Sequence, residues 1–283
     1  MTYMLEGIDV SDVQGFINWK KVKDSGIAYA FCKATDGETY MQKRFKLNWD
    51  GIKSVGLIRG AYHFAHTKND PIKEATHFVA TVGKLDPADM LALDIEDNKN
   101  TLSKEDFINW NISFLETVEK LSNVTPIVYT GGPYFDEHGG RENDKGEWYP
   151  NEEIVNKLSR YPLWLAAYTK NPDKYVPYVW KKVGWTIWQR SGDQCAVGDT
   201  VLHVPGINVV VDRNQYRGTA AELEAFAKGL HHEPKQRIPQ VPLIPIELDL
   251  HSEPAVIDKS ADEPLRAHES TFLGFFQKIF GIK

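Results

Sequence analysis

The chain has 283 residues, of which 42 % are hydrophobic and 25 % charged, and its formal net charge is −6 at pH 7. This composition is that of an ordinary globular protein and leaves room for one large barrel domain or two smaller domains. The acidic balance argues against a general nucleic-acid-binding protein, which would carry a basic excess.

The N-terminal sequence MTYMLEGIDV contains neither a basic region nor a long apolar run, so it predicts no classical signal peptide. No apolar run in the sequence is long enough to span a bilayer. The two cysteines, Cys32 and Cys195, are too few for a disulfide scaffold and lack the spacing of a zinc site. We therefore expect free, packed thiols.

Short apolar runs alternate with amphipathic stretches from the N-terminus to about residue 160. The apolar runs predict strands at Leu5–Val10, Ile27–Ala34, Leu57–Ala65, Met90–Glu96 and Pro126–Thr130. Helical periodicity predicts helices near residues 18–25, 41–55, 71–83 and 103–121. The last of these has a start signal, since Ser103 is followed three residues later by Asp106, as in a capping box. Such alternation is typical of a parallel α/β sheet.

After residue 160 the joining segments are rich in Pro, Gly and Asp. Further strands are predicted at Leu163–Tyr168, Trp185–Arg190 and Asn208–Asp212, and a helix from Thr219 to about Gly229 would close the domain. About eight strands with five clear crossover helices indicate an α/β fold, a modified TIM-like β/α barrel. A regular eightfold barrel is the alternative.

The composition changes again after residue 229. Residues 230–264 contain six prolines and no sustained helical or strand period, which is typical of an extended linker. Residues 265–283 show a phenylalanine-rich face at helical spacing. This amphipathic C-terminal helix would dock on the barrel or on a partner protein, or contact a membrane surface. We therefore divide the chain into a barrel domain (1–229), a proline-rich linker (230–264) and a C-terminal helix (265–283).

The stretch MLALDIED at residues 90–97 carries the candidate catalytic pair. Alternate side chains of a strand face the same way, so Asp94 and Glu96 share one face and stand about 6–7 Å apart. They follow a predicted strand at its carboxyl end, where barrel active sites are built. Repulsion between them should raise one pKa, as a glycosidase needs one protonated and one ionised carboxyl. A structural pair of acids, bonded to helix N-termini or a lysine, is the competing interpretation.

Two more carboxylates end predicted strands: Asp9 in GIDVSDVQG and Asp212 in VVVDRNQY. The first and last strands of a closed barrel are neighbours, so both should lie beside Asp94. Aromatic residues at other strand ends offer faces for sugar rings: Tyr62, Phe64, Tyr129, Trp164 and Tyr168. Core packing would explain any one of these aromatics, but their shared position favours a sugar-binding cleft.

Eight motifs then occur in the order found in glycoside hydrolase family 25, the Chalaropsis-type lysozymes. They are GIDVSDVQG, FCKATDGETY, GAYHFAH, LALDIED, PIVYTGG, PLWLAAY, TIWQ and VPGI with VDRNQY. Over about residues 5–216 the chain resembles this family. The resemblance implies an N-acetylmuramidase on a modified β/α barrel, a peptidoglycan hydrolase cleaving the β-1,4 bond between N-acetylmuramic acid and N-acetylglucosamine.

The resemblance also assigns roles to residues. It implies that Glu96 is the general acid and that Asp94 assists the 2-acetamido group of the substrate, with Asp9 and Asp212 completing the catalytic set. Further positions match those that line the family's cleft: Lys33, Tyr62, Tyr129 and Gln189. The strand spacing alone leaves retention and inversion both open.

No cofactor is implied. His63 and His66 stand three residues apart without an H-E-x-x-H pattern, so we expect no catalytic metal. We also expect Gly131–Gly132 to form only a turn. Residues 136–148 and 193–203 look irregular for the family, which leaves the preference among sugar subsites open.

Two other functions remain possible from the sequence: a non-catalytic glycan-binding barrel and a chitinase-like glycosidase. The expected partner is the glycan strand of peptidoglycan, with no nucleic acid. Without a classical signal peptide, a wall hydrolase would be made in the cytosol. It would reach the wall after release or non-classical export, as a phage endolysin or a secreted effector.

Overall fold

The structure is a computed structural model that describes residues 4–96, 102–140, 151–192, 195–196 and 202–232. All of them belong to one compact unit, Met1–His232. The predicted C-terminal helix and all but the first residues of the predicted linker lie outside the described residues.

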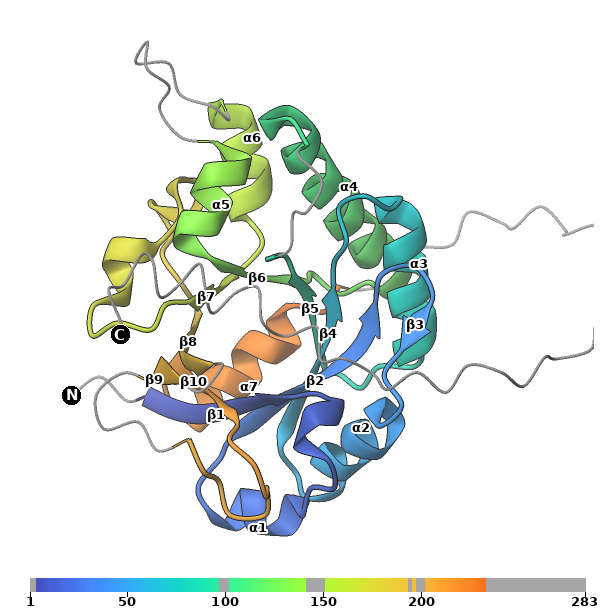
Figure 1. The fold of residues 1–283 in the computed structure, drawn as a ribbon, viewed down its shortest axis with the longest axis vertical. Coiled ribbons are helices and arrows are strands. Elements are labelled where there is room, and N and C mark those ends of the chain that lie inside the picture. The colour runs from blue at the N-terminus through green and yellow to red at the C-terminus, as the bar shows by residue number, and fades with distance from the viewer. Residues whose placement is uncertain (1–3, 97–101, 141–150, 193–194, 197–201, 233–283) are drawn as a thin grey trace, which may run out of the picture. The chain divides into compact units, whose positions relative to one another are not determined.

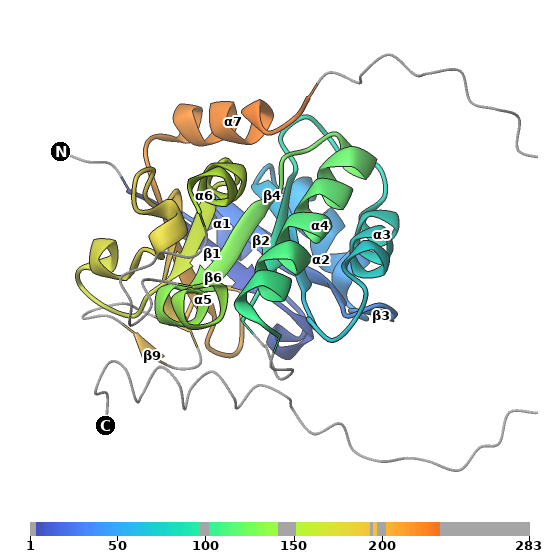
Figure 2. The ribbon, with the colours of Figure 1, turned by 90° about the horizontal axis from the view of Figure 1, so that it is seen from above.

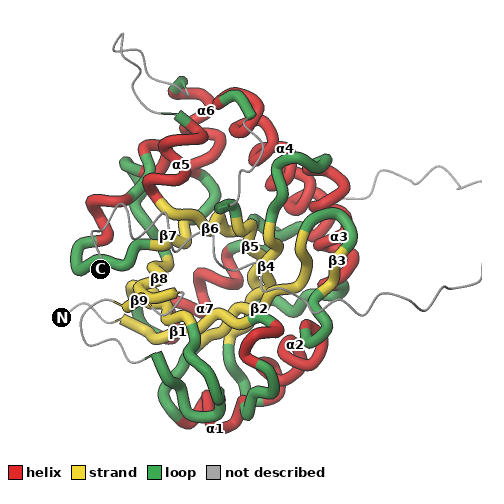
Figure 3. The backbone as a smooth tube through the Cα atoms, in the orientation of Figure 1, coloured by secondary structure: helices red, strands yellow, loops and turns green. Residues whose placement is uncertain are grey.

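The strands of this unit close into a barrel with helices around it (Figures 1 and 3). In pairing order, the barrel strands are β1 (Met4–Val10), β2 (Tyr29–Asp36), β4 (Ile58–Phe64), β5 (Met90–Asp94), β6 (Ile127–Gly131), β7 (Leu163–Ala166), β8 (Ile187–Gly192) and β10 (Asp212–Arg217). All are parallel except β10, which runs antiparallel to both β8 and β1 and closes the ring. Two short strands add antiparallel pairs, β3 (Tyr40–Met41) on β2 and β9 (Cys195–Ala196) on β8. The predicted modified barrel is confirmed, and the regular eightfold barrel is excluded.

The described α-helices are α1 (Trp19–Asp24), α2 (Phe45–Ser54), α3 (Pro71–Val82), α4 (Lys104–Ser122), α5 (Gly132–Gly139), α6 (Glu152–Ser159) and α7 (Ala220–Gly229), and three short 3-10 helices span Asp12–Gln14, Pro172–Tyr175 and Tyr178–Trp180. Helices α1 to α6 surround the barrel, whereas α7 lies across one of its ends (Figures 1 and 2). Helix α4 begins as predicted, because the Ser103 side chain accepts a hydrogen bond from the Asp106 backbone N–H. No described helix is long and apolar enough to cross a membrane.

The last barrel strand differs from the prediction. The apolar run Val209–Val211 was expected to form the strand and Asp212 to end it, but β10 begins at Asp212 and continues to Arg217. Because β10 is antiparallel, its first residue lies at the carboxyl end of the other strands, where Asp212 pairs with Asp9 of β1. Asp212 therefore lies at the predicted end of the barrel, but as the first residue of an antiparallel strand and not as the last residue of the predicted strand.

That direction also explains the position of α7. Strand β10 ends at the amino end of the parallel strands, so the helix that follows covers this end. The Tyr216 hydroxyl donates to the Glu222 backbone carbonyl, and its ring lies 5.8 Å from that of Phe226. Ordered contacts continue past Gly229, since the Thr125 N–H donates to the Leu230 carbonyl and His231 bonds to the Asp89 carbonyl.

Large rings fill the barrel interior, and neighbouring glycines make room for them. A Cβ on Gly60 would lie 2.2 Å from the Phe31 ring, and one on Gly7 would lie 2.2 Å from the Tyr29 ring. Phe31 in turn packs 4.5 Å from the Trp164 ring. The interior below the carboxyl end is therefore a packed floor. Cys32 is a free thiol in this core, as expected, whereas the side chain of Cys195 is outside the described part.

Helices α5 and α6 were not predicted. Gly131–Gly132 was expected to be only a turn, but Gly131 caps α5 and Gly132 is its first residue. The glycine at this position is required by packing, because a Cβ on Gly132 would stand 1.6 Å from the Tyr175 carbonyl oxygen. The short 3-10 helix Pro172–Tyr175 and the start of α5 are therefore in direct backbone contact.

We expect Gly132→Ala to destabilise the protein by about 1–3 kcal/mol, the usual cost of forcing atoms into a packed region, because backbone must move. Gly229→Ala is the matched control, since a Cβ at this last position of α7 meets nothing within 4 Å. Urea unfolding of both variants checks this expectation. Equal midpoints for Gly132→Ala and wild type would contradict the close backbone contact.

Candidate functional site

The carboxyl end of the barrel gathers the predicted carboxylates. Asp9 lies near the end of β1, Asp94 ends β5, and Asp212 begins β10 opposite Asp9. Glu96 follows Asp94 by two residues, just beyond the strand. The pKa of the Tyr62 phenol is raised well above its usual value, first by burial and then by the charges of all these acids: Asp9, Asp94, Asp212 and Glu96. The structure thus places the four predicted carboxylates around one phenol.

Asp9 is held by amide side chains from two neighbouring strands. Its Oδ2 accepts hydrogen bonds from Gln189 Nε2 at 3.0 Å and from Asn214 Nδ2 at 2.7 Å. Gln189 Oε1 accepts from the hydroxyls of Tyr129 (2.8 Å) and Tyr168 (3.0 Å). These donors suit an ionised Asp9, and the network fixes its position within the barrel.

Asp94 has a different environment. It is only 6 % exposed, and its Oδ1 has no hydrogen-bond partner among the described residues. Burial and then the charge of Glu96 raise the pKa of Asp94 well above its usual value, while Lys33 opposes the rise. The pair is therefore suited to holding one proton in common, as expected from the sequence, and the rise falls on Asp94.

The phenols at this end stay neutral. The pKa of Tyr129 is raised well above its usual value by burial, followed by the charges of Glu96, Tyr168 and Asp94. Tyr129 pairs in register with Asp94 on one side and with Trp164 on the other. The Tyr129 proton is already donated to Gln189 Oε1, so toward a polar ligand the neutral Tyr129 oxygen can only accept a hydrogen bond.

The predicted sugar-contacting aromatics do not share one role. Trp164 is 2 % exposed, and its ring packs 4.5 Å from Phe31 and 4.8 Å from Tyr129. Its Nε1 donates to Asn214 Oδ1 at 2.7 Å. The Trp164 ring is therefore part of the packed floor beneath the site, and its contact with a sugar stays a prediction. Phe64 is half-buried beneath the ammonium of Lys33, which lies 4.3 Å from the ring centre.

Three residues of this region were missed in the sequence. Asn214 stands two positions after Asp212, so a strand beginning at Asp212 would have put both on one face. Asp36 and His66 are hydrogen-bonded at the same end, with His66 Nε2 2.5 Å from Asp36 Oδ1. No pattern in the sequence marks that pair.

The two histidines considered as metal ligands lie in separate contacts. His63 bonds to Thr35 and Glu74, whereas His66 bonds to Asp36. In the part of the chain that the structure describes, no three His, Cys, Asp or Glu side chains are grouped to hold a metal ion.

A closed β/α barrel with a carboxyl pair, of which Asp94 is buried, and with neutral phenols at its carboxyl end is the architecture of a barrel glycoside hydrolase. The chain belongs to glycosyl hydrolases family 25, whose sequence profile matches residues 8–199. The family resemblance seen in the sequence motifs is thereby confirmed.

Several relatives match most of the chain. It is 31 % identical to the uncharacterized protein YegX of Escherichia coli K12, over 82 % of this chain and 77 % of YegX. It is also 31 % identical to Lysozyme M1 of Streptomyces globisporus, over 79 % of this chain and 71 % of that enzyme. The crystal structure of a bacterial lysozyme from Streptomyces coelicolor superposes with a TM-score of 0.67 at 30 % identity, covering 80 % of this chain and 98 % of that one.

Proposed function

We propose that this protein is a peptidoglycan hydrolase that cleaves the β-1,4 bond between N-acetylmuramic acid and N-acetylglucosamine. Its membership of family 25 and its similarity to Lysozyme M1 support this class of substrate. The observation that carries the proposal is the Asp94–Glu96 pair, with Asp94 buried at the carboxyl end of the barrel.

In the proposed mechanism, Glu96 protonates the glycosidic oxygen as the bond to the leaving sugar breaks. The carbonyl oxygen of the substrate's own 2-acetamido group attacks the anomeric carbon, and Asp94 accepts a hydrogen bond from the acetamido N–H. Oδ1 of Asp94, which no described residue bonds, is the natural acceptor. Positive charge developing on the acetamido group then favours an ionised Asp94, so the proton shared by the pair resides on Glu96.

Asp9 and Tyr62 complete this arrangement. Asp9 is fixed by Gln189 and Asn214, so it contributes a constant negative charge near the developing positive centre. Tyr62 lies among all four carboxylates and stays protonated, which makes it a donor to a sugar oxygen.

Analysis of the cut ends tests the proposal. Purified peptidoglycan is digested, the new reducing ends are reduced with borohydride, and the products are identified by mass spectrometry. We expect muramitol, because the cut follows N-acetylmuramic acid. Glucosaminitol, or faster release from chitin, would instead indicate a chitinase-like specificity. Binding without release of any reducing end would indicate a non-catalytic glycan-binding barrel.

A further inference from the structure

A β-bulge lies in β2 beside the site. Lys33 pairs with Tyr62 and Thr35 with His63, so the register against β4 shifts between Lys33 and Thr35. In a regular strand, residues three apart point to opposite faces. Here Asp36 pairs with Phe64, so Lys33 and Asp36 both align with the inward side of β4, while Thr35 aligns with the outward His63.

The outward side of the bulge is fixed by buried hydrogen bonds. Thr35 Oγ1 lies 2.7 Å from His63 Nδ1, and His63 Nε2 lies 2.8 Å from Glu74 Oε2. His63 and Glu74 are both fully buried. Glu74, from α3, also accepts from Asn69 Nδ2 and from the backbone N–H of His66. The bulge is therefore a rigid part of the barrel.

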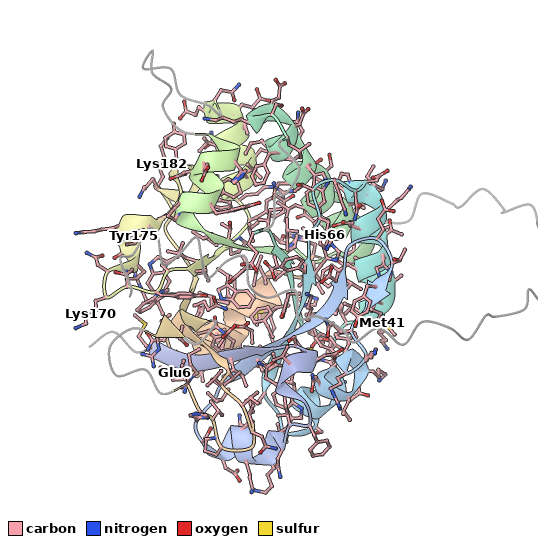
Figure 4. All side chains as sticks on the ribbon, in the orientation of Figure 1. Glu6, Met41, His66, Lys170, Tyr175 and Lys182 are labelled. Atoms are coloured by element: carbon pink, nitrogen blue, oxygen red, sulfur yellow. The ribbon has the colours of Figure 1, made fainter. Side chains whose placement is uncertain are left out.

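The inward side carries a short chain of hydrogen bonds. Lys33 Nζ lies 2.7 Å from Asp36 Oδ2, and the other oxygen of Asp36 lies 2.5 Å from His66 Nε2. His66 is labelled in Figure 4, close to β4 and β5. Although burial raises the pKa of Asp36, the hydrogen bond from His66 and the charge of Lys33 lower it to about 2. Asp36 is therefore ionised at neutral pH.

Lys33 stands between two carboxylates. Its ammonium lies over the Phe64 ring, and Phe64 pairs in register with Asp36 on one side and with Asp94 on the other. The ammonium bonds to Asp36, while Oδ1 of Asp94 has no hydrogen-bond partner among the described residues. Lys33 nevertheless acts through space, since its charge opposes the rise in the pKa of Asp94.

We propose that Asp36 is a positioning residue that tethers the ammonium of Lys33, so that Lys33 acts on Asp94 as a nearby charge while Oδ1 of Asp94 stays open to substrate. The use of that oxygen by substrate rests on the proposed function. Without the tether, Lys33 would pair directly with Asp94 and cover its open oxygen. The groups whose charges or hydroxyls bear on Asp94 are Glu96, Lys33, Asp9, Asp36, Tyr62 and Tyr129.

The tether predicts opposite effects of two substitutions. The titration midpoint of Asp94 is followed by ¹³C NMR of its side-chain carboxyl in the full-length protein. Lys33→Met removes the charge but keeps the stem over Phe64, and should raise the midpoint by about one unit. Asp36→Asn frees Lys33 to pair with Asp94 and should lower it by about one unit. Because the charge of Asp36 also acts on Asp94 directly, the double variant should titrate slightly below Lys33→Met, by less than the shift that Asp36→Asn causes when Lys33 is present.

Kinetics on peptidoglycan give a second readout. We expect Asp36→Asn to lower kcat/KM about tenfold, with KM raised, because the freed Lys33 competes with substrate for Asp94. In a Lys33→Met background the same substitution should have little further effect. Asp36→Glu keeps a carboxylate and should restore part of the activity. Asp24→Asn is the matched control, since Asp24 pairs with Lys20 in an exposed ion pair on α1.

The outcomes separate this inference from the proposed function. If Lys33→Met leaves the midpoint unchanged, or if both substitutions shift it in the same direction, the tether is wrong even when wild type hydrolyses peptidoglycan. Additive losses of kcat/KM in the double variant would likewise show that Asp36 is merely structural. If the midpoints move as expected but wild type yields no muramitol, the tether stands and the proposed function fails. Should Asp36→Asn not fold, Asp36→Glu decides: its carboxylate still holds Lys33, so the midpoint of Asp94 should stay near the wild-type value, and a lowered midpoint would overturn the tether.

Discussion

Glu96→Gln should reduce kcat on peptidoglycan by about 10²–10⁴-fold while the protein remains folded. This loss corresponds to about 3–5 kcal/mol of transition-state stabilisation. Gln keeps the shape and the hydrogen-bonding groups of the side chain but has no acidic proton to give to the leaving oxygen. The position of Glu96 supports the expectation, because it follows Asp94 by two residues just beyond β5 and its charge reaches Asp94, Tyr62 and Tyr129.

The matched control is Glu152→Gln in the first turn of α6. Glu152 lies 3.2 Å from Lys182 in a fully exposed ion pair, so its loss should leave the rate of muramitol release unchanged. Circular dichroism and thermal melts verify that both variants are folded. A folded Glu96→Gln enzyme with a nearly wild-type rate would show that another group supplies the proton.

The fold and the carboxyl pair could be predicted because they follow from local periodicity. Residues 90–96 alternate between a face that packs against helices and a face that ends in two acids, because successive side chains of a strand point to opposite faces. The end of the strand was less certain: β5 stops at Asp94, and Glu96 lies beyond it. The alternating pattern therefore located Asp94 and Glu96, but it did not predict that Glu96 lies outside the strand.

The direction of the last strand could not be read from the sequence. The run Val209–Val211 looks like a buried strand, but β10 follows it, and two of its side chains on the barrel face, Asp212 and Asn214, are polar. Strands are recognised in a sequence by apolar residues at every second position. Where those positions carry polar functional residues, as in β10, this pattern is absent. Asp212 lies beside Asp9, as predicted, only because an antiparallel strand begins at the end of the barrel where the parallel strands finish.

The bulge in β2 could not be predicted either, because the local sequence pattern does not show it. Lys33 and Asp36 are three residues apart, a spacing that puts them on opposite faces of any regular strand. The register shift is held by His63 and Glu74, which approach from β4 and α3. Long-range contacts of this kind override the local pattern, and they are the reason why Asp36 and His66 were missed.

Asp94→Asn should also abolish most of the activity, by about 10²–10³-fold in kcat, the usual effect of removing one group that stabilises charge in the transition state. An amide cannot balance the positive charge that develops on the acetamido group. Because the substrate's own acetamido group is the proposed nucleophile, no glycosyl–enzyme adduct should accumulate on Asp94 in the wild type. Detection of such an adduct by mass spectrometry would show that Asp94 is the nucleophile.

Asp94→Asn should also make the protein more stable at neutral pH. Such a gain would show that Asp94 serves catalysis and not the stability of the fold. Burial, the charge of Glu96 and the unbonded Oδ1 disfavour the ionised form of Asp94, so its pKa is higher in the folded than in the unfolded protein. An acid with a raised pKa destabilises the fold above its unfolded value of about 3.9 and has no such effect below it. Asp94→Asn should therefore melt at a higher temperature than wild type at pH 7, and the difference should vanish near pH 3. A lower melting temperature at pH 7 would mean that the ionised carboxylate supports the barrel and is not held in strain for the substrate.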